Sequence, residues 1–404
     1  LPIANLCLRI PTCRDTQVCI NFEIPILSIK MVIGILKESG DENRVSMLPQ
    51  EAGALVKSDN KVIVESGGGL GAFKSDESYK EAGVGIVSSE EIFSSAEIIL
   101  KINPPSEKEI TQLKKHTTLA GVYQPLNNPT FGSKLAQNKI VCFSLDSIPR
   151  ITRAQSMDVL SSMSTIAGYK AVLIAASRLP RFFPMLMTAA GTIAPSKVLI
   201  LGAGVAGLQA IATARRLGAV VDVFDTRFAV KEQVESLGAR FVEVEGAEED
   251  SKAGGYAVEQ SEAFKQKQKE TIHQHIKRSD IVITTALIPD KKAPLLIPKE
   301  MVESMKSGSV IVDLAAVAGG NCELTEVDKV VVHNQVSIIG DSNLPSTMAE
   351  DASRMYGKNL TNFLKLIISD GKLNINHEDE IIVASCITKN SELLQEKTVE
   401  EVST

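Results

Sequence analysis

The chain has 404 residues and carries 43 Lys and Arg against 49 Asp and Glu, a formal net charge of −6. This length is typical of two domains, and the acidic balance gives no support to nucleic acid as a partner. No uninterrupted apolar run reaches the length that a transmembrane helix needs. The cysteines form no C-x-x-C pair, and His273 and His275 would point to different faces of a helix, so we predict no metal site.

Residues 1–30 differ from the rest, because their pattern is irregular and they do not begin with Met. Arg9 and Arg14 are compatible with the end of a transit peptide, but nearby acidic residues weaken that interpretation. A linker from a longer polypeptide is equally compatible. We therefore treat residues 1–30 as an N-terminal extension or linker and expect the fold to start at Met31.

From Val32 onward short apolar runs alternate with helical segments, such as a helix from Pro49 to Lys57. This alternation predicts a parallel sheet with right-handed crossovers. We predict a first Rossmann-like domain of residues 31–160, completed by residues 350–404 through a long helix over 349–368 and a strand-like IIVASC segment at 381–386. The strands expected before residue 150 are 32–36, 61–65, 84–87, 97–102, 117–122 and 140–144.

A long helix with few charges is expected from Gln155 onward, and it would take the chain from the first domain to the second. We predict that one apolar stripe of this helix is buried. Its members are Met157, Leu160, Ile166, Tyr169, Leu173 and Ile174.

The second predicted domain, residues 161–349, is organised around the stretch from Lys197 to Asp225. An apolar strand over 198–201 runs into G-x-G-x-x-G, a helix over 208–217 and a second strand over 220–224. This is the dinucleotide fingerprint in its full context. The glycines are Gly202, Gly204 and Gly207. They would serve the tight turn, the approach of a pyrophosphate and close helix packing, respectively. The alternative is a buried turn without a ligand.

Asp225 ends the second strand, about 20 residues after the glycines, where an acid accepts hydrogen bonds from a ribose 2′-OH. A carboxylate there repels a 2′-phosphate. The fingerprint therefore predicts NAD rather than NADP.

Beyond Asp225 the alternation continues, apart from an acidic, polar segment over 245–262 that contains Gly255 and Tyr256. This segment is either a lid, in which an aromatic ring covers a cofactor, or a disordered surface loop. The other expected elements are helices over 227–237 and 265–277 and strands over 240–244, 280–285, 309–313 and 336–340, the last of these being the final strand of the domain.

Polar residues gather where the chain crosses between the domains, at the place to which a nicotinamide ring would project. They are Arg150, Gln155, Asp158 and Ser161. An arginine and an aspartate together can hold a carboxamide, because one donates to its oxygen and the other accepts from its NH2. The equally weighted alternative is a capped helix start with a surface ion pair.

Arg44 and Lys101 follow first-domain strands, at the edge that faces the ligand crevice in an open α/β sheet. They could hold an anionic substrate. Ordinary solvated charge is the interpretation that we favour for them.

From Met31 to about Asn390 the chain resembles the NAD(H)-binding component (alpha subunit, domain I) of proton-translocating NAD(P) transhydrogenases, and more distantly alanine dehydrogenases. The matching stretches are KESGDENRVSMLP, PRITRAQSMDVLSS, AGYKAVLIAA, TAAGTIAPSKVLILGAGVAGLQAIATARRLGAVVDVFDTR, KEQVESLGARF, AGGYA, ITTALIP and AGGNCEL. The resemblance implies an α/β fold of two Rossmann-like, doubly wound parallel-sheet domains with a cleft between them.

By this resemblance, Arg150, Gln155, Asp158 and Ser161 belong to the loop at the nicotinamide end, and Tyr256 to a mobile loop that closes over NAD. Contacts with the pyrophosphate and adenosine are implied for Gly202, Gly204, Val205, Gly207, Asp225 and Arg227, and further contacts for Gly255 and Leu287.

The resemblance further implies that NADP(H) binds on a partner domain, that a membrane domain moves protons, and that the chain is a homodimer. It places the chain peripheral to an inner or organelle membrane, on the cytoplasmic or matrix side. Hydride transfer between two nicotinamides needs no acid–base group, only two rings held together away from water.

Two other functions stay open as alternatives. Arg44 and Lys101 match the substrate-carboxylate cations of alanine dehydrogenases, but the histidine expected near Tyr123 is missing and Val317 stands where an aspartate is expected. Amino-acid oxidation needs such an acid–base pair, so we expect no alanine oxidation. The second alternative is a catalytically inert NAD-binding scaffold.

Overall fold

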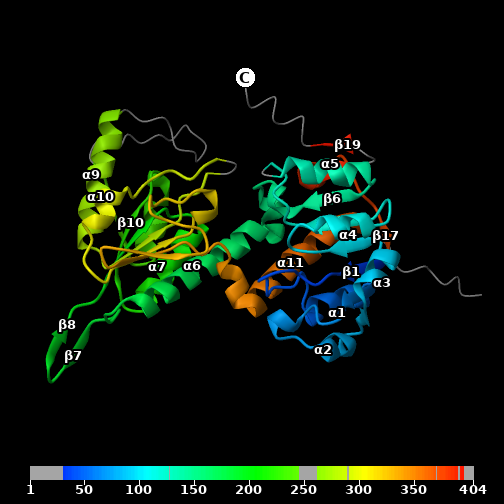
Figure 1. The fold of residues 1–404 in the computed structure, drawn as a ribbon, viewed down its shortest axis with the longest axis horizontal. Coiled ribbons are helices and arrows are strands. Elements are labelled where there is room, and N and C mark those ends of the chain that lie inside the picture. Colours follow the sequence, from blue (N-terminus) through cyan, green and yellow to red (C-terminus); the bar gives the residue numbers. More distant parts are fainter. Residues whose placement is uncertain are drawn as a thin grey trace, which may run out of the picture.

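Two large, mostly parallel sheets, each covered by helices, dominate the computed structural model, which describes residues 31–126, 128–244, 262–288, 291–369, 371–389 and 392–394. The helix α6 (Val159–Arg178) runs from one sheet to the other (Figure 1). The predicted class of two Rossmann-like α/β domains is confirmed.

The first sheet has eight strands in the order β19-β18-β6-β5-β4-β1-β2-β3, and all are parallel to their neighbours except β18 and β19. Its strands are β1 (Val32–Ile35), β2 (Lys61–Glu65), β3 (Gly85–Val87), β4 (Ile98–Leu100), β5 (Thr118–Gly121), β6 (Val141–Ser144), β18 (Cys386–Lys389) and β19 (Glu392–Leu393). Its helices are α1 (Pro49–Lys57), α2 (Asp76–Glu81), α3 (Ser89–Ser95), α4 (Glu107–Gln112), α5 (Pro129–Gln137), α11 (Ala349–Ile367) and α12 (Glu380–Ser385).

Alternate residues of these strands enter two separate cores, one on each face of the sheet. Ile98 and Leu100 pack in the core that contains Phe363 of α11, whereas Ile99 packs in the opposite core. A parallel sheet covered on both faces needs such continuous apolar runs. The helix α11 therefore supplies one of the layers that cover the first sheet.

The second sheet has the order β11-β10-β9-β12-β13-β15-β14, and only β14 is antiparallel to its neighbour. Chain order reverses between β9 and β12, and in such sheets ligands bind outside the carboxyl ends of the strands at that point. Its strands are β9 (Lys197–Leu201), β10 (Val220–Phe224), β11 (Arg240–Phe241), β12 (Ile281–Thr284), β13 (Val310–Asp313), β14 (Val330–His333) and β15 (Val336–Ile339). Its helices are α7 (Val205–Arg216), α8 (Lys231–Ser236), α9 (Glu262–Arg278) and α10 (Lys299–Glu303).

The crossing helix differs from its prediction in both its start and its buried face. It begins at Val159, because Asp158 caps it, and Gln155 lies in the preceding 3-10 helix η3 (Thr152–Met157). Of the predicted stripe only Met157 and Ile166 are buried, whereas Leu160 and Tyr169 are exposed and Leu173 and Ile174 are intermediate. Small residues take the buried face instead, since α7 packs very close to it. They are Gly168, Ala171 and Ala175, and the larger Val159, Ile166 and Val172 are buried as well.

By length and composition alone, α6 is apolar enough to cross a membrane. Its start packs into the core of the first sheet through Val159, and its later turns pack into the core of the second through Ala171 and Val172. A helix shared by two cores needs the same apolar composition. The predicted boundary between residues 160 and 161 falls inside α6, which packs in both cores. The domain limits therefore stay a prediction.

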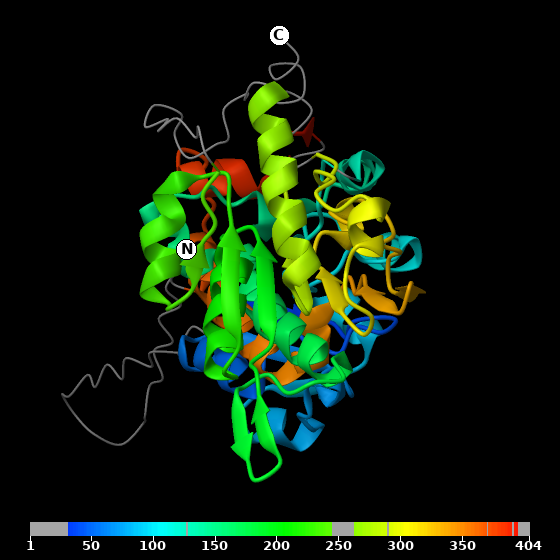
Figure 2. The same cartoon turned by 90° about the vertical axis from the view of Figure 1, so that its left-hand side faces the viewer.

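Further elements differ from expectation. The segment 381–386 is mostly the helix α12, because the Asp379 carboxylate caps it by accepting from the Ile381 N–H at 2.9 Å. The edge strand β14 was not expected. Nor was a hairpin of β7 (Leu186–Thr188) and β8 (Gly191–Ile193), which extends away from the second sheet (Figures 1 and 2).

Candidate functional site

The glycine turn follows β9 at the carboxyl edge of the second sheet. Gly202 has φ +103°, which favours glycine, and a Cβ there would lie 2.5 Å from Oγ1 of Thr285. A Cβ on Gly207 would lie 2.9 Å from the carbonyl carbon of Gly202. Two of the three glycines are therefore required by the packing of the turn itself.

Gly204 is different, because a Cβ placed on it meets no atom within 4 Å. It is the N-cap residue of α7, and the next residue, Val205, is 43% exposed. The start of this helix therefore opens to solvent, where its unpaired N–H groups and dipole suit an anion. An anion such as a pyrophosphate could therefore approach the backbone at Gly204.

Asp225 follows β10 beside the turn, and its carboxylate is nearly buried, with 6% of the side chain exposed. Its oxygens accept from the Ala203 N–H at 2.7 Å and from the Arg227 N–H, Nε and Nη2 at 2.8, 3.0 and 2.9 Å. These four bonds fill the acceptor positions of a carboxylate. Three of the four bonds come from Arg227, whose side chain is 39% exposed, and the role of Asp225 toward a ribose stays a prediction.

The four polar residues predicted at the domain crossing line one hollow of about 320 Å³ at the start of α6, together with Pro149, Ile151 and Ala154. Arg150 and Gln155 are exposed. Asp158 accepts from the backbone N–H of Ser161 at 2.8 Å and from its Oγ at 2.6 Å. The capped helix start is therefore real, but among the described residues no ion pair joins Arg150 to Asp158. Their roles toward a cofactor stay a prediction.

The helix α6 connects this hollow to the glycine turn. A Cβ on Gly168 would lie 2.8 Å from the carbonyl carbon of Ala206, in the first turn of α7. The two candidate parts of one site are therefore held by one helix.

Three predicted site residues remain, namely Leu287, Gly255 and Tyr256. Leu287 is 55% exposed, just beyond the carboxyl end of β12. Gly255 and Tyr256 lie outside the described residues.

Sequence reasoning missed two polar residues that shape the same edge. Thr285 Oγ1 donates to the Gly202 carbonyl at 3.0 Å. Asn321 is fully buried and bonds both the N–H and the carbonyl of Ala286, at 3.1 and 2.9 Å, which fixes the segment before Leu287. The signal for Asn321 was the preceding Gly319-Gly320 pair, since both have positive φ.

Two family models match the chain in succession. The N-terminal domain of "Alanine dehydrogenase/PNT" matches residues 34–167, and its C-terminal domain matches residues 171–396. The chain belongs to the alanine dehydrogenase/PNT family.

Within this family the chain is more similar to transhydrogenases. It is 46% identical to the NAD(P) transhydrogenase subunit alpha of Haemophilus influenzae, covering 90% of this chain and 71% of that protein. It is also 46% identical to a shorter NAD(P) transhydrogenase subunit alpha chain of Rhodospirillum rubrum, covering 90% and 98%. The transhydrogenase structure from Sinorhizobium meliloti matches with a TM-score of 0.83 at 42% identity, covering 90% and 99%. An L-alanine dehydrogenase structure shares the fold, with a TM-score of 0.78 at 24% identity.

The first-domain cations Arg44 and Lys101 are not solvated in this chain, so the prediction of ordinary solvated charge is wrong. Arg44 is 9% exposed and makes a bidentate ion pair with Glu42, at 2.8 and 2.6 Å. Lys101 is fully buried, and its Nζ lies 2.5 Å from Glu109. Both charges are already neutralised within the chain. Val317 is 65% exposed.

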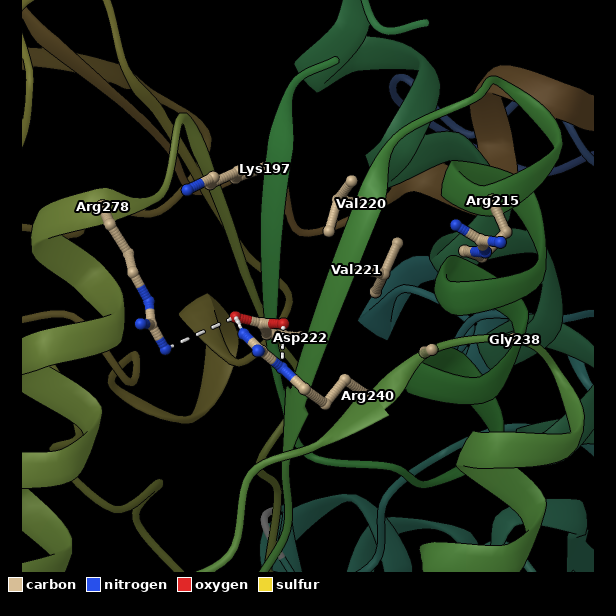
Figure 3. Close-up of a pocket in the computed structure, with 9 residues that line it drawn as sticks. Lys197, Arg215, Val220, Val221, Asp222, Gly238, Arg240 and Arg278 are labelled. Carbon is tan, nitrogen blue, oxygen red and sulfur yellow. Dashed lines mark hydrogen bonds and ion pairs between the residues drawn. The ribbon is translucent and has the colours of Figure 1, made fainter. Parts of the chain in front are cut away.

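A second hollow, of about 450 Å³, lies at the opposite, amino edge of the second sheet (Figure 3). Its centre is Asp222, which Arg240 and His275 bond and Arg278 approaches. Burial raises the pKa of Asp222, but these bonds outweigh it and hold the pKa at about 2. Arg215 and Arg278 also end helices, where cations complement the dipole. The basic lining thus has a structural explanation.

Proposed function

We propose that this chain is the NAD(H)-binding component of a proton-translocating NAD(P) transhydrogenase, in which hydride passes directly between NADH on this chain and NADP on a partner domain. The observation that carries the proposal is the open glycine turn at the carboxyl edge of β9, in a chain 46% identical to transhydrogenase alpha subunits.

The chain's own residues would bind and orient the cofactor. The start of α7 would hold the pyrophosphate, and Asp225 the adenosine ribose. Arg150 would donate to the nicotinamide carboxamide oxygen and Asp158 accept from its NH2. Val205, Arg227, Gly255, Tyr256 and Leu287 are proposed as further cofactor contacts. The bound cofactor supplies the hydride, so the protein contributes position and exclusion of water rather than a proton donor.

The assembly is proposed on the same basis. The named relatives are subunits, which supports a multi-subunit enzyme. We propose a homodimer of this chain, with an NADP-binding domain and a proton-translocating membrane domain as partners. The chain would then lie peripheral to that membrane.

Alanine oxidation is the weaker candidate. Its substrate carboxylate would need Arg44 and Lys101, which internal carboxylates occupy. Alanine oxidation also needs a histidine near the position of Tyr123, and this tyrosine is 1% exposed.

The test mixes the chain with NADH, an NADP analogue of shifted absorbance and the NADP-binding domain of a relative. We expect hydride transfer only when NADH, the NADP analogue and the NADP-binding domain are all present together with the chain. NADH binding without any transfer would refute the proposal. NADH formation from alanine and NAD by the isolated chain should be absent.

An inert scaffold is separated from a transfer component by Asp158→Asn and Gln155→Ala. Both variants should lose transfer rate far more than NADH affinity. Equal small losses in both quantities would favour the scaffold.

A further inference from the structure

We propose that Glu42 and Arg44, together with Asn343, form an interdomain clamp that positions the nicotinamide site for hydride transfer. The inference rests on the proposed function and goes beyond it, because it assigns a positioning role to residues outside the cofactor contacts.

The chain passes between the domains at two places. One is α6, and the other is the 3-10 helix η6 (Leu344–Met348), where Leu344 packs in the second core and Ala349 in the first. Such crossings are where domains rotate against one another. Any contact that holds both crossings fixes the angle between the sheets.

Arg44 reaches both crossings from the loop after β1. Its Nη1 lies 3.1 Å from Sδ of Met163, in the second turn of α6, close to the Asp158 cap. Its Nη2 lies 3.4 Å from Oδ1 of Asn343, the residue before η6. One guanidinium thus contacts the start of α6 and the return segment.

Glu42 completes the arrangement. Its carboxylate holds the guanidinium in a bidentate fork and accepts from Nδ2 of Asn343 at 3.1 Å. The Asn343 amide therefore bonds both members of the ion pair, which fixes its orientation. The side chains of Glu42 and Arg44 are 3% and 10% exposed, so water competes little for these bonds.

The loop that bears the pair is itself held by neighbouring elements. A Cβ on Gly71 would lie 2.6 Å from the carbonyl oxygen of Asn43, so the loop lies directly on η1 (Leu70–Ala72). The Asn43 N–H donates to Oγ of Ser346 in η6 at 2.8 Å, and Ser346 Oγ also bonds the Asp41 carbonyl at 3.1 Å. The clamp therefore transmits the position of the first domain to both crossings.

The functional consequence concerns geometry at the reacting end of the cofactor. The proposed pyrophosphate and ribose contacts lie wholly in the second domain, whereas the hollow of Arg150 to Ser161 lies at the crossing. Loss of the clamp should leave most of the affinity intact and displace the nicotinamide end. A displacement near 1 Å can cost roughly a hundredfold in rate.

The test compares the parent chain with Arg44→Met and with the double variant E42Q/R44M. The double variant removes both charges at similar volume, so it avoids an unpaired buried carboxylate. The matched control is Lys80→Met, which breaks an exposed first-domain pair with Glu77. We expect transfer to fall about tenfold or more in both clamp variants, NADH affinity to change less than about threefold, and the control to match the parent.

A second readout measures the domains directly. Spin labels at Lys57→Cys and Lys267→Cys, in chains with Cys7, Cys13 and Cys19 changed to Ser, report the distance between the sheets. The clamp variants should broaden or shift that distribution. Parental rate or parental distances in a folded E42Q/R44M chain would overturn the clamp. If the parent itself transfers no hydride, the proposed function fails, and the distances alone decide whether the clamp exists.

Discussion

In the second sheet β9 ends in a turn whose Gly204 faces open space, whereas in the first sheet β1 and β4 end among buried charges that are already paired. Both sheets are doubly wound, and both edges are where such folds bind ligands. The difference shows that fold alone does not make a site. Unsatisfied donors remain at one edge, and internal ion pairs close the other.

The largest effect expected at the open edge is that of Gly207→Ala. The added Cβ meets the Gly202 carbonyl, so the turn must open before the helix can pack. We expect NADH affinity to fall more than about a hundredfold, with unfolding free energy lowered by about 1–3 kcal/mol. Calorimetric titration and urea unfolding measure the two. Parental NADH affinity would show that the turn does not hold the cofactor.

Gly204→Ala separates a ligand cradle from a merely buried turn. Its φ of −75° suits alanine and its Cβ meets nothing, so the stability of the free chain should not fall. NADH affinity should still fall, by roughly 10–100-fold, since the backbone needs to approach the pyrophosphate closely. Unchanged affinity at unchanged melting temperature would favour a turn without a ligand.

Asp225→Asn tests the choice between NADH and NADPH. Loss of the charge weakens the ribose bond by about 1.5 kcal/mol, or roughly tenfold, and releases Arg227 to meet a 2′-phosphate. The parent should prefer NADH strongly, and the variant should bind NADPH more tightly than the parent does. Fluorescence titration with both nucleotides measures this. A parent that binds both equally would contradict the assignment.

The carboxyl edge of the first sheet contains a buried acid, Glu38, which leads to a prediction about how stability depends on pH. Burial raises the pKa of Glu38 from 4.5 to about 7, against the opposing bonds from the N–H groups of Ile102 and Asn103 and the charge of Lys101. The folded chain therefore binds this proton more tightly than the unfolded chain. The contribution of Glu38 protonation to the free energy of unfolding is complete below pH 4.5 and is lost as the pH rises toward 7.

Between pH 5.5 and 7 this loss amounts to about 1.5 kcal/mol. Glu38→Gln mimics the protonated acid, so it should remove that slope and leave NADH affinity unchanged. Urea unfolding at several pH values measures it. An identical pH slope in parent and variant would show that Glu38 titrates normally.

Residues that act through their sequence neighbours were predictable. The glycine turn, β2, β10 and α1 occupy the expected positions, because their signals are local: an apolar run, a positive φ that favours glycine, or a proline at a helix start. The grouping of Arg150, Gln155, Asp158 and Ser161 also followed from sequence, since η3 and the α6 cap are short-range structures.

Contacts between distant segments were not predictable. The buried face of α6 depends on how closely α7 approaches Gly168, and apolarity alone favoured the larger residues instead. The sequence favoured solvated charge for the first-domain cations, because the groups that surround a side chain are known only once the chain has folded. Arg44 lies 299 residues from Asn343, which it contacts.

The sequence by itself therefore determined which edge is chemically equipped for a dinucleotide, because glycines and a terminal acid define that turn locally. Only the tertiary structure decided that the other edge is closed. Whether a charge is free or neutralised depends on which distant groups the fold brings within hydrogen-bonding distance, and on how much water the packing leaves around it.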